Sequence, residues 1–404
     1  METMQHAVVR RSANYQSNVF TIFMDEKGRS KHEPPYSTEK KGRTSIGHTR
    51  KINIAACSTR FNINNTYMET TMQQAEIRRS ANYQPSVCNH ESIHSLDSDY
   101  KQYLCWWNNL GLGKKLSFSR DLLAESFMWA AEVFYQPQYA YTRFCVAQLI
   151  QFVTTIDDVY DVYGSREEVE LFTDVIQRWD INAMGHLPNF MELCFLALFN
   201  SVNDLGYNTL KEHGCNIIPF LKKLFGDLCK RYLKESQWYY EGYTPTLAEY
   251  LSNAWVTIGV PAILSCAYFS MKHEMMESGL EIVNSYPDVI KWSSIINRLC
   301  DDLGTAKDEM ARGDVPKSVQ CYMHETGVSG EAAREHIKDL IQEAWKKLNK
   351  ELVCDSPLPR AFVEATMHTA RTFHGFYQFG DGFASNRDIT TAKFKKLLVE
   401  PLPI

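Results

Sequence analysis

From residue 115 onward, apolar residues recur every three or four positions, which is the spacing of helices that bury one face. This pattern predicts a nearly continuous series of helices, over residues 116–135, 139–163, 166–179, 189–202, 210–235, 247–269, 287–312, 330–350, 361–379 and 388–399. Short segments rich in Gly, Pro, Asn or Ser, such as 206–208 and 355–357, predict the corners between helices. The sequence lacks runs of alternating β-branched residues, so we predict an all-α helical bundle.

The predicted helix 139–163 carries carboxylates within an otherwise apolar pattern. Asp157 and Asp161 are four residues apart, so on an α-helix they share one face, with their backbones about 6 Å apart along the axis. Asp158 flanks them. Earlier turns of the same face carry apolar side chains, namely Val146, Ile150 and Val153. We therefore expect an apolar well with an acidic rim.

The predicted helix 287–312 carries a second polar stripe. Asp301, Thr305 and Glu309 are spaced i, i+4 and i+8, and Arg298 lies one turn earlier on nearly the same side. Carboxylate and hydroxyl oxygens suit Mg²⁺ or Mn²⁺ and suit zinc poorly. One such motif alone is more often a solvated acidic face. Two of them on apolar-periodic helices favour divalent ions that bridge acidic side chains to a phosphate-rich ligand.

Composition narrows the class of protein. The 404 residues are 44% hydrophobic and carry a net charge of −5, which supports a large core and argues against nucleic acid as a partner. The 11 cysteines form no C-x-x-C pair, so we expect a reducing compartment. The most apolar run, 255–269, is short and is interrupted by Gly259 and Pro261, so we predict no membrane span.

The two motifs together resemble the metal motifs of plant class I terpene synthases: the first motif is Asp157-Asp158-x-x-Asp161, and the second is Asp301-Asp302-x-x-Thr305-x-x-x-Glu309. Flanking segments agree, namely Ser-Phe-Ser-Arg-Asp at 117–121, Arg-Leu-Cys-Asp-Asp at 298–302, Gly-Asp-Gly at 380–382 and Leu-Leu-Val-Glu-Pro at 397–401. The resemblance extends from about Trp106 to the end of the chain and is closest to the angiosperm monoterpene synthase branch. It implies the helical bundle of the isoprenoid synthase fold and a carbon–oxygen lyase that acts on an isoprenyl diphosphate.

The resemblance also implies three Mg²⁺ or Mn²⁺ ions in each active site. By family analogy Asp157 and Asp161 bind two of them, and Asp158 supports this cluster. The third ion is bound by Asp301, Thr305 and Glu309. Metal ions would neutralise the charge that develops on the leaving diphosphate.

Other residues match family positions around the substrate. Arg120 and Arg298 correspond to arginines that hydrogen-bond the diphosphate, for which a guanidinium fork is well suited. Trp129 matches a pocket position, and Tyr377 and Asp381 resemble a loop that closes over the bound diphosphate. A carbocation needs a dry pocket with aromatic faces. We name five aromatic residues as wall candidates, meaning that they could line this pocket. For each of them, plain core packing is an equally good interpretation. They are Trp129, Phe152, Trp255, Phe373 and Tyr377.

Two features bear on the product. In the family, the helix break that matches Gly259 and Pro261 frees backbone carbonyls inside the pocket, where they steer the cation and the diphosphate. A simple helix bend would leave the same sequence pattern. Ile150 offers no hydrogen bond to position a water molecule on the pocket face. It therefore favours a hydrocarbon product over an alcohol or ether.

The N-terminal third differs from the family pattern. Residues 1–67 look like a disordered leader; the segment 42–68 has basic but no acidic residues, which suits an organelle transit peptide and a plastid stromal location, or a plain disordered tail. The sequence at 10–16 recurs at 78–84, and the second copy resembles the tandem-arginine segment of monoterpene synthases. We expect 68–104 to be that segment plus a remnant of an N-terminal helical domain that is otherwise missing, and 105–404 to be the catalytic domain.

The expected activity is the ionisation and cyclisation of geranyl diphosphate to a monoterpene. A sesquiterpene synthase acting on farnesyl diphosphate and a catalytically weakened, truncated relative are the alternatives. A prenyl-elongating transferase is less favoured because the second motif is not a second DDxxD, and a protonation-initiated cyclase would need a D-x-D-D tetrad, which the sequence lacks. We expect an isoprenyl diphosphate as the only small-molecule partner, no nucleic acid, and a monomer or weak homodimer.

Overall fold

The computed structural model describes residues 90–116, 118–120, 122–273, 277–312, 315–378, 380 and 392, without the side chains of 90–95, 162, 277 and 307–312. The expected leader, the tandem-arginine repeat, Asp381 and nearly all of the predicted helix 388–399 lie outside the described residues.

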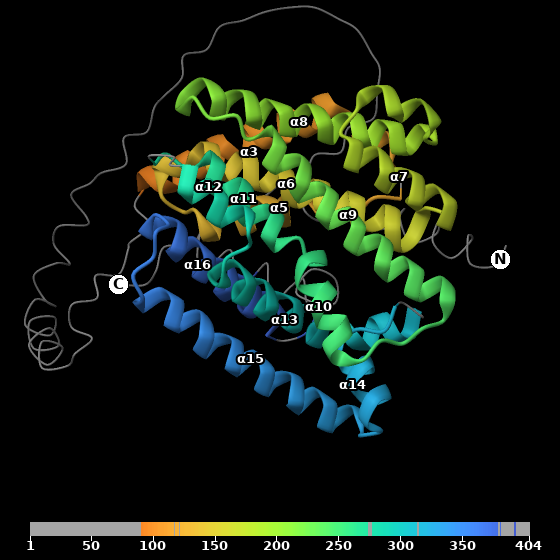
Figure 1. The fold of residues 1–404 in the computed structure, drawn as a ribbon. Helices are drawn as coiled ribbons and strands as arrows, with labels where there is room; N and C mark the ends of the chain where they lie inside the picture. Colours follow the sequence, from red (N-terminus) through yellow and green to blue (C-terminus); the bar gives the residue numbers. More distant parts are fainter. Residues whose placement is uncertain are drawn as a thin grey trace, which may run out of the picture. The chain divides into compact units, whose positions relative to one another are not determined.

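The described residues form a helical bundle (Figure 1). In chain order its elements are α3 (His90–Leu110), α4 (Leu112–Lys115), α5 (Leu123–Val133), the 3₁₀ turn η3 (Pro137–Tyr139), α6 (Ala140–Asp158), the π-turn η4 (Val159–Tyr163), α7 (Arg166–Arg178), the 3₁₀ turn η5 (Ile181–His186), α8 (Asn189–His213), α9 (Ile218–Glu241), α10 (Leu247–Thr257), α11 (Val260–Ser270), α12 (Glu277–Asn284), α13 (Asp288–Arg312), α14 (Ser318–Thr326), α15 (Gly330–Val353) and α16 (Arg360–Tyr377). No strand occurs in this part of the chain, where the sole β-type contact is an isolated bridge between Gln378 and Gly380. The predicted all-α fold is confirmed.

The centre of the bundle is α11. Every residue of this helix, Val260–Ser270, is buried, and the helix packs against both α6 and α13. On its other sides α6 packs against α5, and α13 packs against α15 and α16. In Figure 1, α8 lies along the top of the view and α15 along the bottom. The packing places α6 and α13, which carry the two motifs, on either side of the central helix.

The segment Leu247–Ser270, which comprises α10 and α11, is long and apolar enough to cross a membrane by length and composition alone, with a mean hydropathy of 1.3. In the structure 78% of the most apolar 18-residue stretch of this segment is buried inside the bundle, which is typical of a core helix. The predicted interruption is present, because α10 ends at Thr257 and Gly259 takes a left-handed backbone conformation with φ 79°.

Two predicted helix boundaries are wrong. The corner expected at 206–208 lies inside α8, which continues to His213 and ends at Gly214, where φ is 71°. Gly206 serves packing instead of a turn, since a Cβ atom there would lie 2.2 Å from Cδ1 of Ile218 at the start of α9. The predicted helix 116–135 is also too long, because α5 covers only Leu123–Val133.

The helix α3 was not predicted, and residue 105, the expected start of the catalytic domain, falls within it. Tyr103 is fully buried and its hydroxyl donates a hydrogen bond to the carbonyl oxygen of Ala147 in α6, at 3.2 Å. Arg143 of α6 is also fully buried, and its Nε donates to Asp99 of α3 at 3.1 Å. These contacts join α3 to the same core as α6.

Candidate active site

The first motif lies where α6 changes from an α-helix to a π-turn. The N–H of Gly164 donates to the carbonyl oxygen of Val159 at 2.8 Å, five residues earlier, instead of four as in an α-helix. The Asp157 side chain is 31% exposed, whereas that of Asp158 is 4% exposed. Asp161 is exposed. Two of the three carboxylates therefore face solvent, and Asp158 points into the protein.

Arg120 holds the first motif from the loop before α5. Its backbone N–H and its Nε donate to Asp158 at 2.8 and 2.7 Å, and its Nη2 donates to Asp157 at 2.7 Å. The loop is anchored on α6, because Nε2 of Gln151 donates to the Arg120 carbonyl oxygen at 3.1 Å. Burial raises the pKa of Asp158 to about 6, although the charge of Arg120 opposes that shift.

The second motif repeats this arrangement within α13. Nε of Arg298 donates to Asp302 at 2.7 Å, and the same guanidinium donates to Asp301. Asp302 is fully buried, while the Asp301 side chain is 15% exposed. The hydroxyl of Thr305 donates to the Asp301 carbonyl oxygen at 2.9 Å, so its lone pairs remain available. The backbone of Glu309 continues α13, and its side chain lies outside the described residues.

In both motifs one arginine therefore binds two consecutive aspartates, of which the first is partly exposed and the second is buried. A buried carboxylate already paired with an arginine is a poor ligand for a metal ion. The exposed carboxylates are better candidates.

The chemistry of the exposed donors fits hard divalent cations. Although Asp161 is exposed, the surrounding protein desolvates its carboxylate and, with the nearby charge of Asp157, raises its pKa to about 8. A cation between these two carboxylates would relieve that repulsion. Among the described side chains, no three His, Cys, Asp or Glu residues lie close enough together to hold an ion by themselves. Bound Mg²⁺ usually combines one or two carboxylates with water molecules and substrate phosphates.

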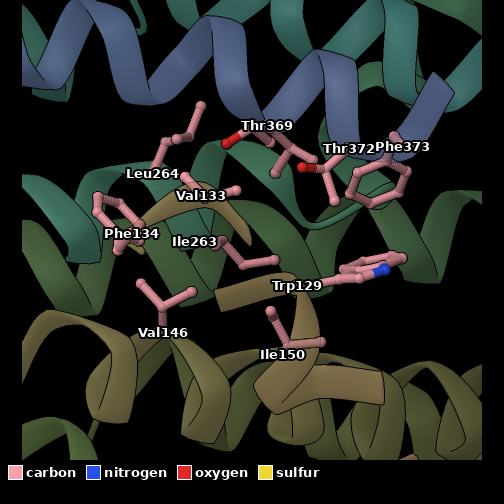
Figure 2. Close-up of a pocket in the computed structure, with 11 residues that line it drawn as sticks. Trp129, Val133, Phe134, Val146, Ile150, Ile263, Leu264, Thr369, Thr372 and Phe373 are labelled. Carbon is pink, nitrogen blue, oxygen red and sulfur yellow. The ribbon is translucent and has the colours of Figure 1, made fainter. Parts of the chain in front are cut away.

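An apolar cavity lies among α5, α6, α11 and α16 (Figure 2). Trp129 packs against Phe373 with ring centroids 4.0 Å apart, and Ile150 approaches from α6. The lining is Trp129, Val133, Phe134, Val146, Ile150, Val260, Ile263, Leu264, Thr369, Thr372 and Phe373. Since Ile150 lies about two turns before Asp157 on α6, the cavity lies below the first motif.

Three wall candidates do not line this cavity, namely Tyr377, Phe152 and Trp255. Phe152 is fully buried and packs edge-on against Trp106 of α3, with centroids 5.7 Å apart. Trp255 packs edge-on against Tyr286 at 5.9 Å. For Phe152 and Trp255 core packing is the correct interpretation.

The break between α10 and α11 lies at the cavity. A Cβ atom on Gly259 would lie 2.5 Å from Cγ1 of Val153, one turn before Asp157 on α6. Glycine is thus required twice, for its positive φ and for the close approach of the two segments. The next residue, Val260, lines the cavity.

The end of α16 rests on the second motif. A Cβ atom on Gly304 would lie 2.7 Å from Cδ1 of Tyr377 and 3.3 Å from the carbonyl group of Gly380. Gly304 lies between Asp301 and Thr305, so Tyr377 is placed beside the predicted metal ligands.

The comparisons with known proteins agree with this geometry. The family model described as "Terpene synthase family, metal binding domain" matches residues 108–347. The chain belongs to the terpene synthase family. The predicted resemblance is thereby confirmed.

Relatives of the chain include a (−)-alpha-terpineol synthase from Vitis vinifera, which is 50% identical over 305 residues covering 76% of this chain and 52% of the relative. A chloroplastic myrcene synthase from Quercus ilex is 48% identical over 307 residues, which cover 76% of this chain and 51% of the relative. The structure of isoprene synthase from Populus x canescens, in complex with three Mg²⁺ ions and dimethylallyl-S-thiolodiphosphate, matches with a TM-score of 0.73 and 43% identity, covering 77% of this chain and 60% of that one. The chain spans about half the length of the curated relatives it matches.

Sequence reasoning missed two charged residues near the motifs. Lys317 is buried, its charge acts on Asp161 to lower the carboxylate pKa, and the N–H of the next residue, Ser318, donates to Asp302 at 3.1 Å. Lys317 therefore lies between the two motifs. Glu235 is 3% exposed, accepts hydrogen bonds from α10, and adds negative charge near Asp161. Neither residue belongs to a spacing pattern, so no sequence signal identified them.

Proposed function

We propose that this protein is a metal-dependent monoterpene synthase that ionises geranyl diphosphate, cyclises the resulting cation and releases diphosphate. The observation that carries this proposal is the pair of matching arginine–aspartate–aspartate arrangements on α6 and α13, with an apolar cavity below the first. The terpineol and myrcene synthases among the relatives support the ten-carbon substrate, because terpineol and myrcene are ten-carbon products. The three Mg²⁺ ions in the isoprene synthase complex support the same number of Mg²⁺ or Mn²⁺ ions here.

Oxygen donors of both motifs would hold the ions. Asp157 and Asp161 would serve the first motif, and Asp301, Thr305 and Glu309 the second. When bound, the metal ions supply Lewis-acid stabilisation of the leaving diphosphate. The roles of Asp158 and Asp302 in this proposal are to hold the arginines. Arg120 and Arg298 would then donate to diphosphate oxygens.

The cavity walls act on the cation. When the carbon–oxygen bond breaks, its electron pair leaves with the diphosphate and the hydrocarbon becomes an allylic cation. The faces of Trp129 and Phe373 stabilise that positive charge, and the apolar lining keeps water away. A ring closes by attack of the distant double bond on the cationic carbon. Loss of a proton then gives a neutral hydrocarbon, and Ile150 offers no group to hold a water molecule that would compete.

The organisation of the chain remains part of the proposal. Residues 105–404, together with the preceding turns of α3, would form the catalytic domain, and residues 1–67 would direct the protein to the plastid. The word "chloroplastic" in the names of relatives supports that location. The substrate would be the only partner, with the protein a monomer or weak homodimer.

Product analysis tests the proposal. The full chain is incubated with Mg²⁺ and either geranyl or farnesyl diphosphate, beside an Asp157→Ala variant and a Tyr207→Leu variant on the exposed side of α8. We expect cyclic monoterpenes from geranyl diphosphate, at an unchanged rate in Tyr207→Leu and lost in Asp157→Ala. Preferred turnover of farnesyl diphosphate would make it a sesquiterpene synthase. No turnover of either substrate by folded protein would refute the activity and leave a binding-only relative.

A further inference from the structure

The helix α6 continues into the π-turn Val159–Tyr163, which contains Asp161, whereas Asp157 lies in the α-helical part before it. π-Turns are rare and occur mostly as single turns within α-helices, frequently at functional sites. If the segment reverted to α-helical hydrogen bonding, each following side chain would rotate about the helix axis. Asp161 would then change its position relative to Asp157.

Three aromatic side chains meet at the end of this turn, and we call Phe118, Tyr163 and Phe190 the aromatic cluster. The rings of Phe118 and Tyr163 stack with centroids 4.1 Å apart and an interplanar angle of 11°. Phe190, at the start of α8, lies edge-on to both, at 5.7 Å from Phe118 and 5.0 Å from Tyr163. Edge-to-face and offset-stacked geometries are the favourable ones for aromatic pairs.

The position of Tyr163 argues against a simple core-filling role. Its side chain is 52% exposed, so little apolar area is buried by it. The adjoining residue, Gly164, is held from a third helix, because the Tyr240 hydroxyl of α9 donates to its carbonyl oxygen at 3.3 Å. The contacts around Tyr163 thus converge on the end of the π-turn.

The aromatic cluster connects the two segments that carry charged groups of the first motif. Phe118 lies two residues before Arg120, and Tyr163 lies two residues after Asp161. On the Arg120 side, the hydroxyls of Ser119 and Thr155 form a hydrogen bond at 3.0 Å, and the Arg120 N–H donates to Asp158. A shift of Tyr163 would therefore displace both Asp161 and the loop that carries Arg120.

We infer that Tyr163 is a positioning residue, which stacks on Phe118 and thereby keeps the π-turn in the form that places Asp161 beside Asp157 and Arg120. The inference rests on the proposed function, because it concerns binding of diphosphate with its divalent ions at this motif. In this role Tyr163 acts through Asp161 and Arg120.

Calorimetric titration of inorganic diphosphate, in excess Mg²⁺, tests the inference on the full chain. We expect Tyr163→Leu to weaken diphosphate binding about tenfold, which is the scale of one favourable aromatic pair. Tyr163→Phe keeps the ring and should bind as tightly as the wild type. Tyr207→Leu removes a tyrosine that is 64% exposed on α8 and should also bind as the wild type does.

A double-mutant cycle separates positioning from loss of fold. Phe118→Leu, Tyr163→Leu and the double variant are compared in diphosphate affinity and in melting temperature. We expect the double variant to bind about as weakly as either single variant, because the stack is already lost. Fully additive losses, wild-type affinity in Tyr163→Leu, or equal weakening in Tyr163→Phe would overturn the inference. If the wild type itself bound no diphosphate, the proposed function would fail as well. If the wild type bound diphosphate and turned over substrate, but the Tyr163 and Phe118 variants bound as the wild type does, only the positioning role would be refuted.

Discussion

Asp302 gives the sharpest prediction about stability. Its carboxylate is fully buried and accepts hydrogen bonds from Nε of Arg298 at 2.7 Å, from the Tyr250 hydroxyl at 3.0 Å and from the Ser318 N–H at 3.1 Å. These contacts join α13 to α10 and to the start of α14. The variant Asp302→Asn keeps the shape of the side chain, but it removes the charge and replaces one acceptor oxygen with a donor.

The magnitude follows from burial. Removing one partner of a buried ion pair costs about 3–5 kcal/mol, because the remaining charge is left without compensation. Arg298 keeps Asp301 as a second acceptor. We therefore expect the lower end, about 3 kcal/mol. Asp301→Asn is the matched control, since Asp301 is 15% exposed and Arg298 keeps the fully buried Asp302, so a smaller loss of stability is expected.

Urea unfolding followed by circular dichroism measures both variants, with an unchanged slope against denaturant as the condition for comparing midpoints. Turnover of geranyl diphosphate is measured in parallel, and both variants should lose it. Asp302→Asn should lose both turnover and stability. Asp301→Asn should lose turnover with a smaller loss of stability. Equal destabilisation by the two substitutions would refute the division of labour between the exposed and the buried aspartate.

Three further outcomes are expected. Gly259→Ala should destabilise the protein by about 2 kcal/mol in the same urea assay, because Gly259 has a positive φ and lies in contact with Val153. Adding Val153→Ala should restore part of that loss, and no restoration would contradict the packing explanation. Ile150→Ser should raise the share of alcohols among the products measured by gas chromatography, because a hydroxyl in the cavity can hold water; an unchanged product profile would count against a role for this position in excluding water. Removal of divalent metal with a chelator should abolish turnover, and either Mg²⁺ or Mn²⁺ should restore it, whereas activity that survives chelation would contradict the metal-dependent proposal.

The sequence allowed the helical fold and the positions of both motifs to be predicted, because they depend on local spacing. The period of apolar residues reports which face of a helix is buried, and it placed Ile150 and Val146 on the cavity side. The error at 206–208 shows the limit of local signals. Gly206 looks like a helix breaker, and only its contact with Ile218, a residue of the next helix, explains why it lies inside α8.

The parts of the site that sequence reasoning missed depend on contacts between distant segments. The π-turn at Val159–Tyr163 is accompanied by ring contacts with Phe118 and Phe190, which lie far away in the chain. The burial of Asp302 depends likewise on Tyr250 and Ser318, from two other segments. Periodicity within one helix contains no information about such partners.

The resting state of the two arginines has a consequence for the order of binding. Arg120 and Arg298 are held by carboxylates, so an anion that arrives alone must compete with those aspartates for the same guanidinium groups. A cation that arrives alone meets aspartates whose charge is already partly neutralised. Each ligand would free the groups that the other needs, and thermodynamic linkage makes this help mutual. We expect the affinity for Mg²⁺ to rise when diphosphate is present and by the same factor in the reverse titration, so that the empty protein would discriminate against metal-free phosphates without any dedicated barrier.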